Sequence, residues 1–235
     1  MTRFIGVHFF LLLVILAGLT YPLAQAETVW DYTFYKRFDT ASFRLYQPAQ
    51  MPIDFDNILY PLLNAAIFFE TNRRRLENGK TPFVHARPLE ESAFMHARDM
   101  AIHSFFSHEN PHDPGKRTLV QRLALFGVND GYRAENISEM FGIRYEQGSA
   151  VIPPGNGRTE FRDFQTGRTI PNHTYLSFAE ALLDGWMKSA GHRANILNEA
   201  LRFLGCGAYH YRNVEFYGMA QFKAVQNFSS FVPGE

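Results

Sequence analysis

The sequence of 235 residues predicts an α+β domain in which helices come before a pair of strands. Residues 58–76 place apolar side chains at steps of three and four, which is typical of a helix packed on one side. Residues 204–211 and 214–224 are rich in β-forming side chains and are separated by a short turn. Strands and helices do not alternate along the sequence, so a parallel sheet built from βαβ units is not predicted.

The N-terminal residues have the features of a secretory signal peptide. Arg3 precedes an apolar run from Phe9 to Leu19, and the small residues Ala24-Gln25-Ala26 follow. A membrane anchor is the alternative, but a span needs about 20 consecutive apolar residues, and this run is broken at Thr20 to Pro22. We therefore expect residues 1–26 to be removed, leaving a secreted, periplasmic or envelope protein without a transmembrane anchor.

The remaining chain is long enough for one domain. We expect an N-terminal extension over residues 27–57, the domain itself over 58–226 with an insertion at about 142–175, and a tail over 227–235. Lysine and arginine number 23, as do aspartate and glutamate, so no net charge favours nucleic acid as a partner. The chain has one cysteine and is not a disulfide scaffold. Cys206 lies in a strand-like segment and is expected to be a small buried side chain rather than a reactive thiol.

The extension over residues 27–57 is aromatic but has no clean period. Its aromatic residues include Trp30, Tyr32, Phe34, Tyr35, Phe38, Phe43 and Tyr46. We expect this segment to pack irregularly on the surface of the domain.

The first long helix is predicted from Ile58 to the Asn78-Gly79 pair, which ends it. One stripe of this helix is expected to face the core: Ile58, Leu62, Ala65, Phe69, Asn72 and Leu76. The basic run Arg73-Arg74-Arg75 lies near the C-terminal end of this helix. We expect it to be solvated and stabilised by the helix dipole rather than to form a phosphate site.

Pro88 opens the second predicted helix, which ends near His103. Glu90 and Glu91 lie in its first turn, where negative charge is stabilised. Its predicted core face consists of Leu89, Ala93, Ala97 and Met100. Thr118 is expected to cap a short third helix that runs through Leu125 and ends at Gly127.

Ser177 is expected to cap a fourth helix, which leads to Ser189 and delivers His192 into a turn. The face predicted for its packing consists of Phe178, Ala181, Leu182, Gly185 and Trp186. The β-rich segments that follow, Leu204 to Tyr211 and Val214 to Ala224, are predicted to form a hairpin with its turn at Arg212-Asn213.

The segment from His108 to His112 matches the H-E-x-x-H pattern of zinc proteases. That chemistry requires both histidines on one helical face, and Pro111 disrupts the turn between them. Asp113-Pro114-Gly115 follows at once, so we expect a loop and no such protease site.

Three separated segments carry a resemblance to a known family. They are Phe105-Phe106-Ser107-His108, Ala134-Glu135-Asn136-Ile137-Ser138, and the stretch from Gly185 to Leu197 that contains Trp186, Ser189 and His192. Together they resemble the CAP superfamily, or SCP-like extracellular domain, in its bacterial form, over about Ile58 to Ala224. The resemblance implies a three-layer α-β-α sandwich with a cavity at one end.

The resemblance also implies a set of cavity residues. CAP cavities carry two histidines and two glutamates, and His108, Glu135 and His192 match the first histidine, the first glutamate and the second histidine. Ser189 occupies the position that animal and plant members give to the second glutamate. Two neutral imidazoles suit zinc or a similar divalent ion, with Glu135 orienting a ring or a water molecule. Without the second carboxylate, zinc is favoured over magnesium or calcium.

Two other interpretations of the same residues stay open. Ser189 and His192 lie three residues apart, so the serine could act as a nucleophile with His192 as its base and Glu135 or His108 as the orienting group. Alternatively, the cluster only closes the fold through hydrogen bonds, with Asn136 and Asn195 satisfying backbone groups.

We therefore expect an exported binding or scaffold protein whose cavity takes a divalent metal, a small apolar ligand such as a lipid, or a cell-wall fragment. The alternative is a metal-assisted or serine-type hydrolase of peptides or envelope polymers. The residue at position 189 favours binding, because it removes one candidate for general acid or base. The insertion at 142–175 is predicted either to cover the cavity or to form a mobile surface loop.

Overall fold

The protein is represented by a computed structural model, which describes residues 31–157 and 159–234. The predicted signal peptide, residues 1–26, lies outside the described residues. Within the described part, no helix has both the length and the apolar character that a membrane span needs.

The predicted order of helices before strands is only partly confirmed, because strands over 84–85, 133–141, 151–152 and 162–163 lie between helices. The helices are α1 Phe34–Arg37, α2 Thr40–Arg44, α3 Tyr60–Glu77, α4 Arg87–Ile102, α5 Leu119–Ala124, α6 Tyr175–Lys188 and α7 Ala190–Leu197. The strands are β1 Val84–His85, β2 Arg133–Phe141, β3 Val151–Ile152, β4 Arg162–Asp163, β5 Phe203–Asn213 and β6 Met219–Ser229. Short 3-10 turns are η1 Gln47–Gln50, η2 Pro114–Lys116 and η3 Val214–Phe216.

The main sheet has the strand order β1-β5-β6-β2, with β1 parallel to β5 and the other pairs antiparallel. β5 and β6 form the predicted hairpin, but its turn lies after Asn213 rather than at Arg212-Asn213. The Asn213 side chain accepts hydrogen bonds from the backbone of Glu215 and Phe216 at 3.0 and 3.2 Å, which fixes η3. Tyr217 and Gly218 then reverse the chain with φ values of 53° and 73°.

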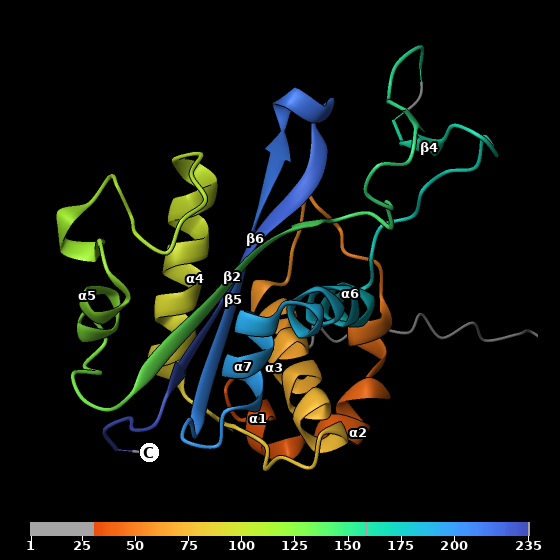
Figure 1. Cartoon of the computed structure of the whole chain (residues 1–235). Coiled ribbons are helices and arrows are strands. Elements are labelled where there is room, and N and C mark those ends of the chain that lie inside the picture. Colours follow the sequence, from red (N-terminus) through yellow and green to blue (C-terminus); the bar gives the residue numbers. More distant parts are fainter. Residues whose placement is uncertain (1–30, 158, 235) are drawn as a thin grey trace, which may run out of the picture.

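Helices cover both faces of this sheet (Figure 1). α3, α6 and α7 lie on one face with the largest apolar cluster, and α4 and α5 lie on the other with two smaller clusters. The alternation along β5 explains this division, since Leu204, Cys206 and Ala208 all belong to the α3 and α6 cluster. The predicted α+β fold and its three α-β-α layers are confirmed.

Two glycines bring α4 directly onto β5. A Cβ atom at Gly205 would lie 2.0 Å from the backbone nitrogen of Glu90, and one at Gly207 would lie 2.2 Å from that of Phe94. No larger residue fits there without moving the helix. The predicted burial of Cys206 between them is also confirmed, since it is 1% exposed.

The prediction that the N-terminal extension packs irregularly on the surface is wrong. The extension belongs to the main core. Phe43, Ala49 and Ile53 are fully buried in the cluster of α3 and α6. α2 begins with a capping box in which Asp39 accepts a hydrogen bond from the Ser42 backbone. Among the described aromatic residues of the extension, only Phe43 on α2 is fully buried, whereas α1 buries none of its residues and Tyr35, Phe38 and Tyr46 pack against the core from outside it.

The predicted burial along α3 is confirmed except at its C-terminal end, where Leu76 is 49% exposed. The helix is buried on almost every side between Leu62 and Asn72 because α2, α6 and the sheet surround it. Its C-terminal basic run is not the solvated end that we predicted. Arg75 is 2% exposed and donates to the carbonyls of Thr81, Ile196 and Asn198.

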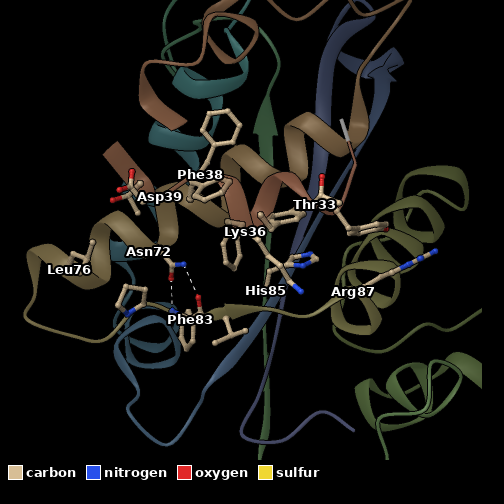
Figure 2. Close-up of a pocket in the computed structure, with 16 residues that line it drawn as sticks. Thr33, Lys36, Phe38, Asp39, Asn72, Leu76, Phe83, His85 and Arg87 are labelled. Atoms are coloured by element: carbon tan, nitrogen blue, oxygen red, sulfur yellow. Dashed lines mark hydrogen bonds between the residues drawn. The ribbon is translucent and has the colours of Figure 1, made fainter. Parts of the chain in front are cut away.

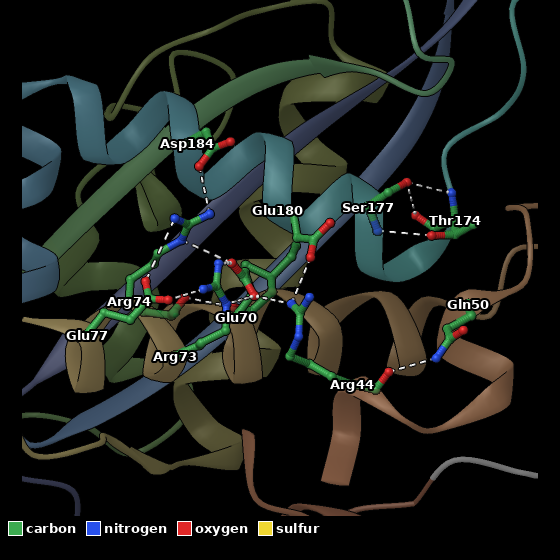
Figure 3. Close-up of polar contacts among 12 residues, drawn as sticks. Arg44, Gln50, Glu70, Arg73, Arg74, Glu77, Thr174, Ser177, Glu180 and Asp184 are labelled. Atoms are coloured by element: carbon green, nitrogen blue, oxygen red, sulfur yellow. Dashed lines mark hydrogen bonds and ion pairs between the residues drawn. The ribbon is translucent and has the colours of Figure 1, made fainter. Parts of the chain in front are cut away.

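The other two arginines of this run bind acidic side chains (Figure 3). The Glu70 side chain is fully buried and is paired with Arg73, Arg74 and Arg44 of the extension. Arg74 also reaches Asp184 on α6 at 2.6 Å. This network joins α2, α3 and α6, so it ties the extension to the domain.

The remaining helix predictions need one correction. The predicted core face of α4 is confirmed, and the Thr118 cap of α5 forms a capping box with Gln121. In α6, Thr174 is the N-cap, and Ser177 is its capping-box partner three residues later. Gly185 is exposed. The buried face of α6 consists of Tyr175, Phe178, Ala179, Leu182, Leu183 and Trp186.

The insertion at 142–175 contains the β3–β4 pair and has its own small apolar cluster around Ile143, Phe161 and Met219. It leaves the sheet after Phe141, at the end of β2 that is opposite to Glu135. Figure 1 shows it projecting away from α5 and α7. Its described residues therefore lie beside the tip of the β5–β6 hairpin rather than over Glu135.

Candidate functional site

His108 lies in the loop between α4 and α5. The prediction that the H-E-x-x-H segment forms a loop rather than a helix is confirmed. Two side chains hold this loop. Buried His96 on α4 forms a hydrogen bond from its Nε2 to the Ser107 carbonyl at 3.0 Å. The Lys223 ammonium lies 5.1 Å from the centre of the Phe106 ring, within the range of a cation–π contact. The His108 side chain itself is 57% exposed.

Glu135 lies on β2 with its side chain toward the layer of α4 and α5. Its Oε1 atom is 2.8 Å from His108 Nδ1, and its Oε2 atom accepts a hydrogen bond from an Arg122 amino group at 2.8 Å. When the amide of Asn227 is oriented to satisfy both its oxygen and its nitrogen, it donates to Oε2 at 3.2 Å as well. The carboxylate is 3% exposed and bound on both oxygens.

Sequence reasoning missed Arg122, which completes this arrangement. Its side chain is fully buried, and it also donates to the backbone carbonyls of Lys116, Arg117 and His108. It therefore fixes both the carboxylate and the loop that carries His108. The signal was the position of Arg122 next to Leu123 on the apolar side of a short helix, where a charged residue requires a buried partner.

These contacts determine the pKa values of the pair. Burial alone would raise the pKa of Glu135, but the hydrogen bond from His108 and the charge of Arg122 lower it below the ordinary value. The hydrogen bond to Glu135 raises the pKa of His108 above its ordinary value, against its partial burial. Glu135 is thus a permanent anion near neutral pH, and His108 holds its proton more tightly than a free histidine.

His192 comes from the opposite layer. It lies in the first turn of α7 rather than in a turn after a helix, because Ser189 ends α6 and at once begins α7. Burial lowers the pKa of His192, and the charge of His108 lowers it further. The pKa of His192 thus responds to the charge of His108, although no hydrogen bond joins the two imidazoles within the described residues.

Asparagine side chains fasten α7 to β2. Asn195 donates to Asn136 Oδ1 at 2.8 Å and to the Glu135 carbonyl at 3.4 Å, and Asn136 donates to the His192 carbonyl at 3.2 Å. The Trp186 indole donates to the Ile137 carbonyl at 3.3 Å. The hydrogen-bond network that we considered as a purely structural alternative is thus present around the histidines.

The structure therefore brings His108, Glu135 and His192 together, but not Ser189 as a nucleophile. Among the described residues, no hydrogen bond joins the Ser189 hydroxyl to His192, and Ser189 is half-buried at the junction of two helices. Across the same residues, no group of three or more histidine, cysteine, aspartate or glutamate side chains is placed to hold a metal ion. With Glu135 bound to Arg122, only the two imidazoles of the predicted set remain as candidate metal ligands.

A second His–Glu pair lies elsewhere, and sequence reasoning missed it. His85 on β1 and Glu90 on α4 are 2.6 Å apart, and the Tyr35 hydroxyl donates to the same carboxylate oxygen at 2.8 Å. The side chains of His85 and Glu90 are 10% and 6% exposed. Their spacing of five residues gave no helical signal, because one residue precedes the helix and the other lies inside it.

Comparison with known proteins gives one extensive match. The family model described as the cysteine-rich secretory protein family, CAP, matches residues 68–228. No curated protein matches the chain.

Several solved structures are similar to this chain at low sequence identity. An extracellular protein with an SCP domain from Bacillus anthracis has 24% identity and a TM-score of 0.49, covering 76% of this chain and 44% of that one. An outer surface protein from Borrelia burgdorferi has 13% identity and a TM-score of 0.46, covering 77% and 97%. A cysteine-rich secretory protein from Staphylococcus aureus has 16% identity and a TM-score of 0.43, covering 74% and 40%. This chain thus spans less than half the length of the Bacillus and Staphylococcus proteins.

Proposed function

Because this chain belongs to the cysteine-rich secretory protein (CAP) family, we propose that it is an exported binding or scaffold protein rather than a hydrolase. The observation that carries this proposal is the state of Glu135. Its two carboxylate oxygens are bound to His108 and to fully buried Arg122.

A general acid or base must exchange a proton near the working pH. The pKa of Glu135 is lowered, with His108 and Arg122 favouring its charged form, so this carboxylate keeps its charge at neutral pH. Ser189 lacks a hydrogen bond to His192 within the described residues, so it has no activating base. Neither group has the state that hydrolysis would require, and the observations favour binding.

The ligand-binding groups in this proposal are the two imidazoles. A carboxylate that holds one ring nitrogen of a histidine orients the other nitrogen toward a ligand. Glu135 holds His108 at Nδ1, and the exposed ring leaves Nε2 for a ligand. With His192 as the second ligand, the site suits a zinc-type ion, which prefers nitrogen. With only two protein ligands, such a site binds weakly.

Other ligands fit the same surface. Phe106 is 49% exposed in the loop that carries His108, and an exposed aromatic ring beside hydrogen-bonding groups suits a cell-wall fragment or a small apolar molecule. The zinc-type ion is the simplest of these to test.

The test is a calorimetric titration of zinc into the chain that begins at Glu27, together with His108→Ala and His192→Ala. The matched control is His112→Ala, which removes another histidine of the same loop. We expect one weak site that both site variants abolish and the control keeps. The proposed site is refuted if the heat of zinc binding is lost only in the control variant. Turnover of peptide or cell-wall substrates that Glu135→Gln abolishes without unfolding would refute the proposed binding function.

A further inference from the structure

A cavity of about 570 Å³ lies between the N-terminal extension and the domain, away from His108 and Glu135 (Figure 2). One side of it is lined by residues of the extension, namely Tyr32, Thr33, Tyr35, Lys36, Phe38, Asp39 and Thr40, and the other by α3, Pro82, Phe83, β1 and the first residue of α4. Small-molecule sites have volumes of about 300–1,000 Å³. The cavity therefore has the size of a ligand site, and the extension forms part of its wall.

The wall is mainly aromatic. The rings that line the cavity are Tyr32, Tyr35, Phe38, Phe68, Phe69, Phe83 and His85. Several of them already pack in ordered pairs, since His85 stacks on Tyr35 with centroids 3.5 Å apart, and Phe68 meets both rings edge-on. Rigid aromatic walls favour a flat ring, which can stack on one face and meet the edge of another.

One cation on this wall is available to a ligand. The backbone N–H of Lys36 donates to the Thr33 carbonyl, but its side-chain ammonium makes no ion pair or hydrogen bond with any residue in the described ranges. Arg87, also in the wall, is held by Glu91 at 2.7 Å and lies over the Tyr32 ring. Asp39 lines the cavity too, but its carboxylate accepts hydrogen bonds from the Ser42 backbone and hydroxyl.

His85 supplies a fixed polar group on the same wall. Its Nε2 atom is bound to Glu90 at 2.6 Å, and the ring lines the same cavity as Lys36 (Figure 2). Because Nε2 is engaged, Nδ1 is the atom left for a ligand. The cavity thus combines aromatic walls with one free ammonium and one oriented imidazole.

We propose that this cavity binds a small planar aromatic compound that carries one negative charge, such as an aromatic carboxylate. The ring lies among Phe68, Phe69 and Phe83, and the carboxylate faces Lys36 and His85. The inference rests on the proposed binding function but uses residues unrelated to His108 and His192, so either site can fail without the other.

The test is a fluorescence displacement titration on the chain that begins at Glu27, with anilinonaphthalene sulfonate as the probe and naphthoate as the competitor. We expect naphthoate to bind about tenfold more tightly than uncharged naphthamide, because the ammonium attracts the carboxylate. Lys36→Glu should remove this preference. Arg37→Glu is the matched control, since it makes the same charge change at a neighbouring residue that lies over Phe34 and does not line the cavity.

A second variant tests the cavity without changing charge. Val84 lines it on the edge strand and is 46% exposed, so Val84→Trp fills space at little cost to folding. We expect this variant to lose naphthoate binding and to keep zinc binding at His108 and His192. The proposal is overturned if naphthoate does not bind, if both variants leave its binding unchanged, or if laurate competes more strongly. Binding that appears only after removal of residues 27–30 would also overturn it, because the chain's own segment would then fill the cavity.

Discussion

Two His–Glu pairs in the described part of the chain are alike in their hydrogen bond and differ in their surroundings. His108 and Glu135 are 2.8 Å apart, and His85 and Glu90 are 2.6 Å apart. Glu135 also binds the buried guanidinium of Arg122, whereas no arginine or lysine in the described ranges forms an ion pair with Glu90. The histidines differ in the opposite sense, because the His108 side chain is 57% exposed and that of His85 is 10% exposed.

This difference shows that the partner of the carboxylate, more than the pair itself, sets what the histidine can do. Arg122 holds Glu135 as a fixed anion, so His108 is presented to solvent in one orientation. Glu90 is satisfied by the neutral Tyr35 hydroxyl, and stacked rings cover His85. The first pair suits a surface ligand site, and the second suits the polar part of the wall of the aromatic cavity.

The largest expected effect comes from removing the cation of the first pair. Arg122→Met leaves Glu135 as a buried carboxylate without a full counter-charge, which costs about 3–5 kcal/mol. Urea unfolding, followed by the fluorescence of buried Trp186, measures the free energy of unfolding. The control is Arg117→Met, whose side chain is 61% exposed and pairs with Glu109, so its loss should stay below about 1 kcal/mol. Equal losses would show that Arg122 has no special role.

Replacing the carboxylate should also cost more free energy of unfolding in the first pair than in the second. Glu90→Gln leaves no unpaired buried cation and keeps an oxygen that accepts from Tyr35, so we expect a loss of about 1–3 kcal/mol. Glu135→Gln leaves the Arg122 charge buried and should cost about 3–5 kcal/mol. The same unfolding measurement on both variants compares them directly. A larger loss for Glu90→Gln would reverse our account of the two pairs.

The hydroxyl that replaces a cation in the second pair should contribute less. Tyr35→Phe keeps the ring but removes the hydrogen bond to Glu90, and we expect a loss of about 0.5–1.5 kcal/mol. Tyr209→Phe is the control, because the Tyr209 ring stacks on Tyr60 and its hydroxyl makes no hydrogen bond within the described residues. Thermal unfolding of the two variants gives the comparison. An unchanged midpoint for Tyr35→Phe would mean that the hydroxyl is not needed to satisfy Glu90.

The smallest effect is a dependence on pH with opposite signs for the two site histidines. The pKa of His108 is raised, chiefly by its hydrogen bond to Glu135. Its stabilisation is full below about pH 6.5, the ordinary histidine value, and is lost as the pH rises through the raised value. The pKa of His192 is lowered by burial, so its contribution is present above about pH 6.5 and is lost as the pH falls through the lowered value.

We expect these signs to appear in thermal unfolding of the wild type, His108→Gln and His192→Gln, measured from about pH 5 to about pH 9. The His108 side chain is 57% exposed and His192 is half-buried, so each effect should stay below about 1 kcal/mol. The stability difference between wild type and His108→Gln should shrink toward alkaline pH. The difference for His192→Gln should shrink toward acid pH, and a common trend for both variants would contradict the assigned shifts.

The sequence predicted those parts of the fold that rest on local patterns. The stripe from Leu89 to Met100 and the capping residue Thr118 each encode a helix within a few turns, and both are confirmed. The N-terminal extension could not be predicted in this way. The burial of Phe43 and Ile53 depends on contacts with α3 and α6, which are distant in the chain.

The candidate site divides along the same line. His108, Glu135 and His192 were found because family motifs mark them. Arg122 and Asn227 were missed because only the folded structure brings them to Glu135. Arg122 is 13 residues away in the sequence, and Asn227 lies opposite Glu135 in the pairing of β2 with β6. A buried charge on the apolar side of a helix was the single local indication of Arg122.

The contacts that fasten α7 to β2 have a consequence for the behaviour of the protein at high concentration. β2 is an edge strand, and an exposed edge is a template for pairing with a strand of another molecule. The outward carbonyls of Glu135 and Ile137 are already engaged by the Asn195 amide and the Trp186 indole. The opposite edge, β1, is only two residues long. The side chains that hold His192 in place therefore also act against aggregation by strand addition.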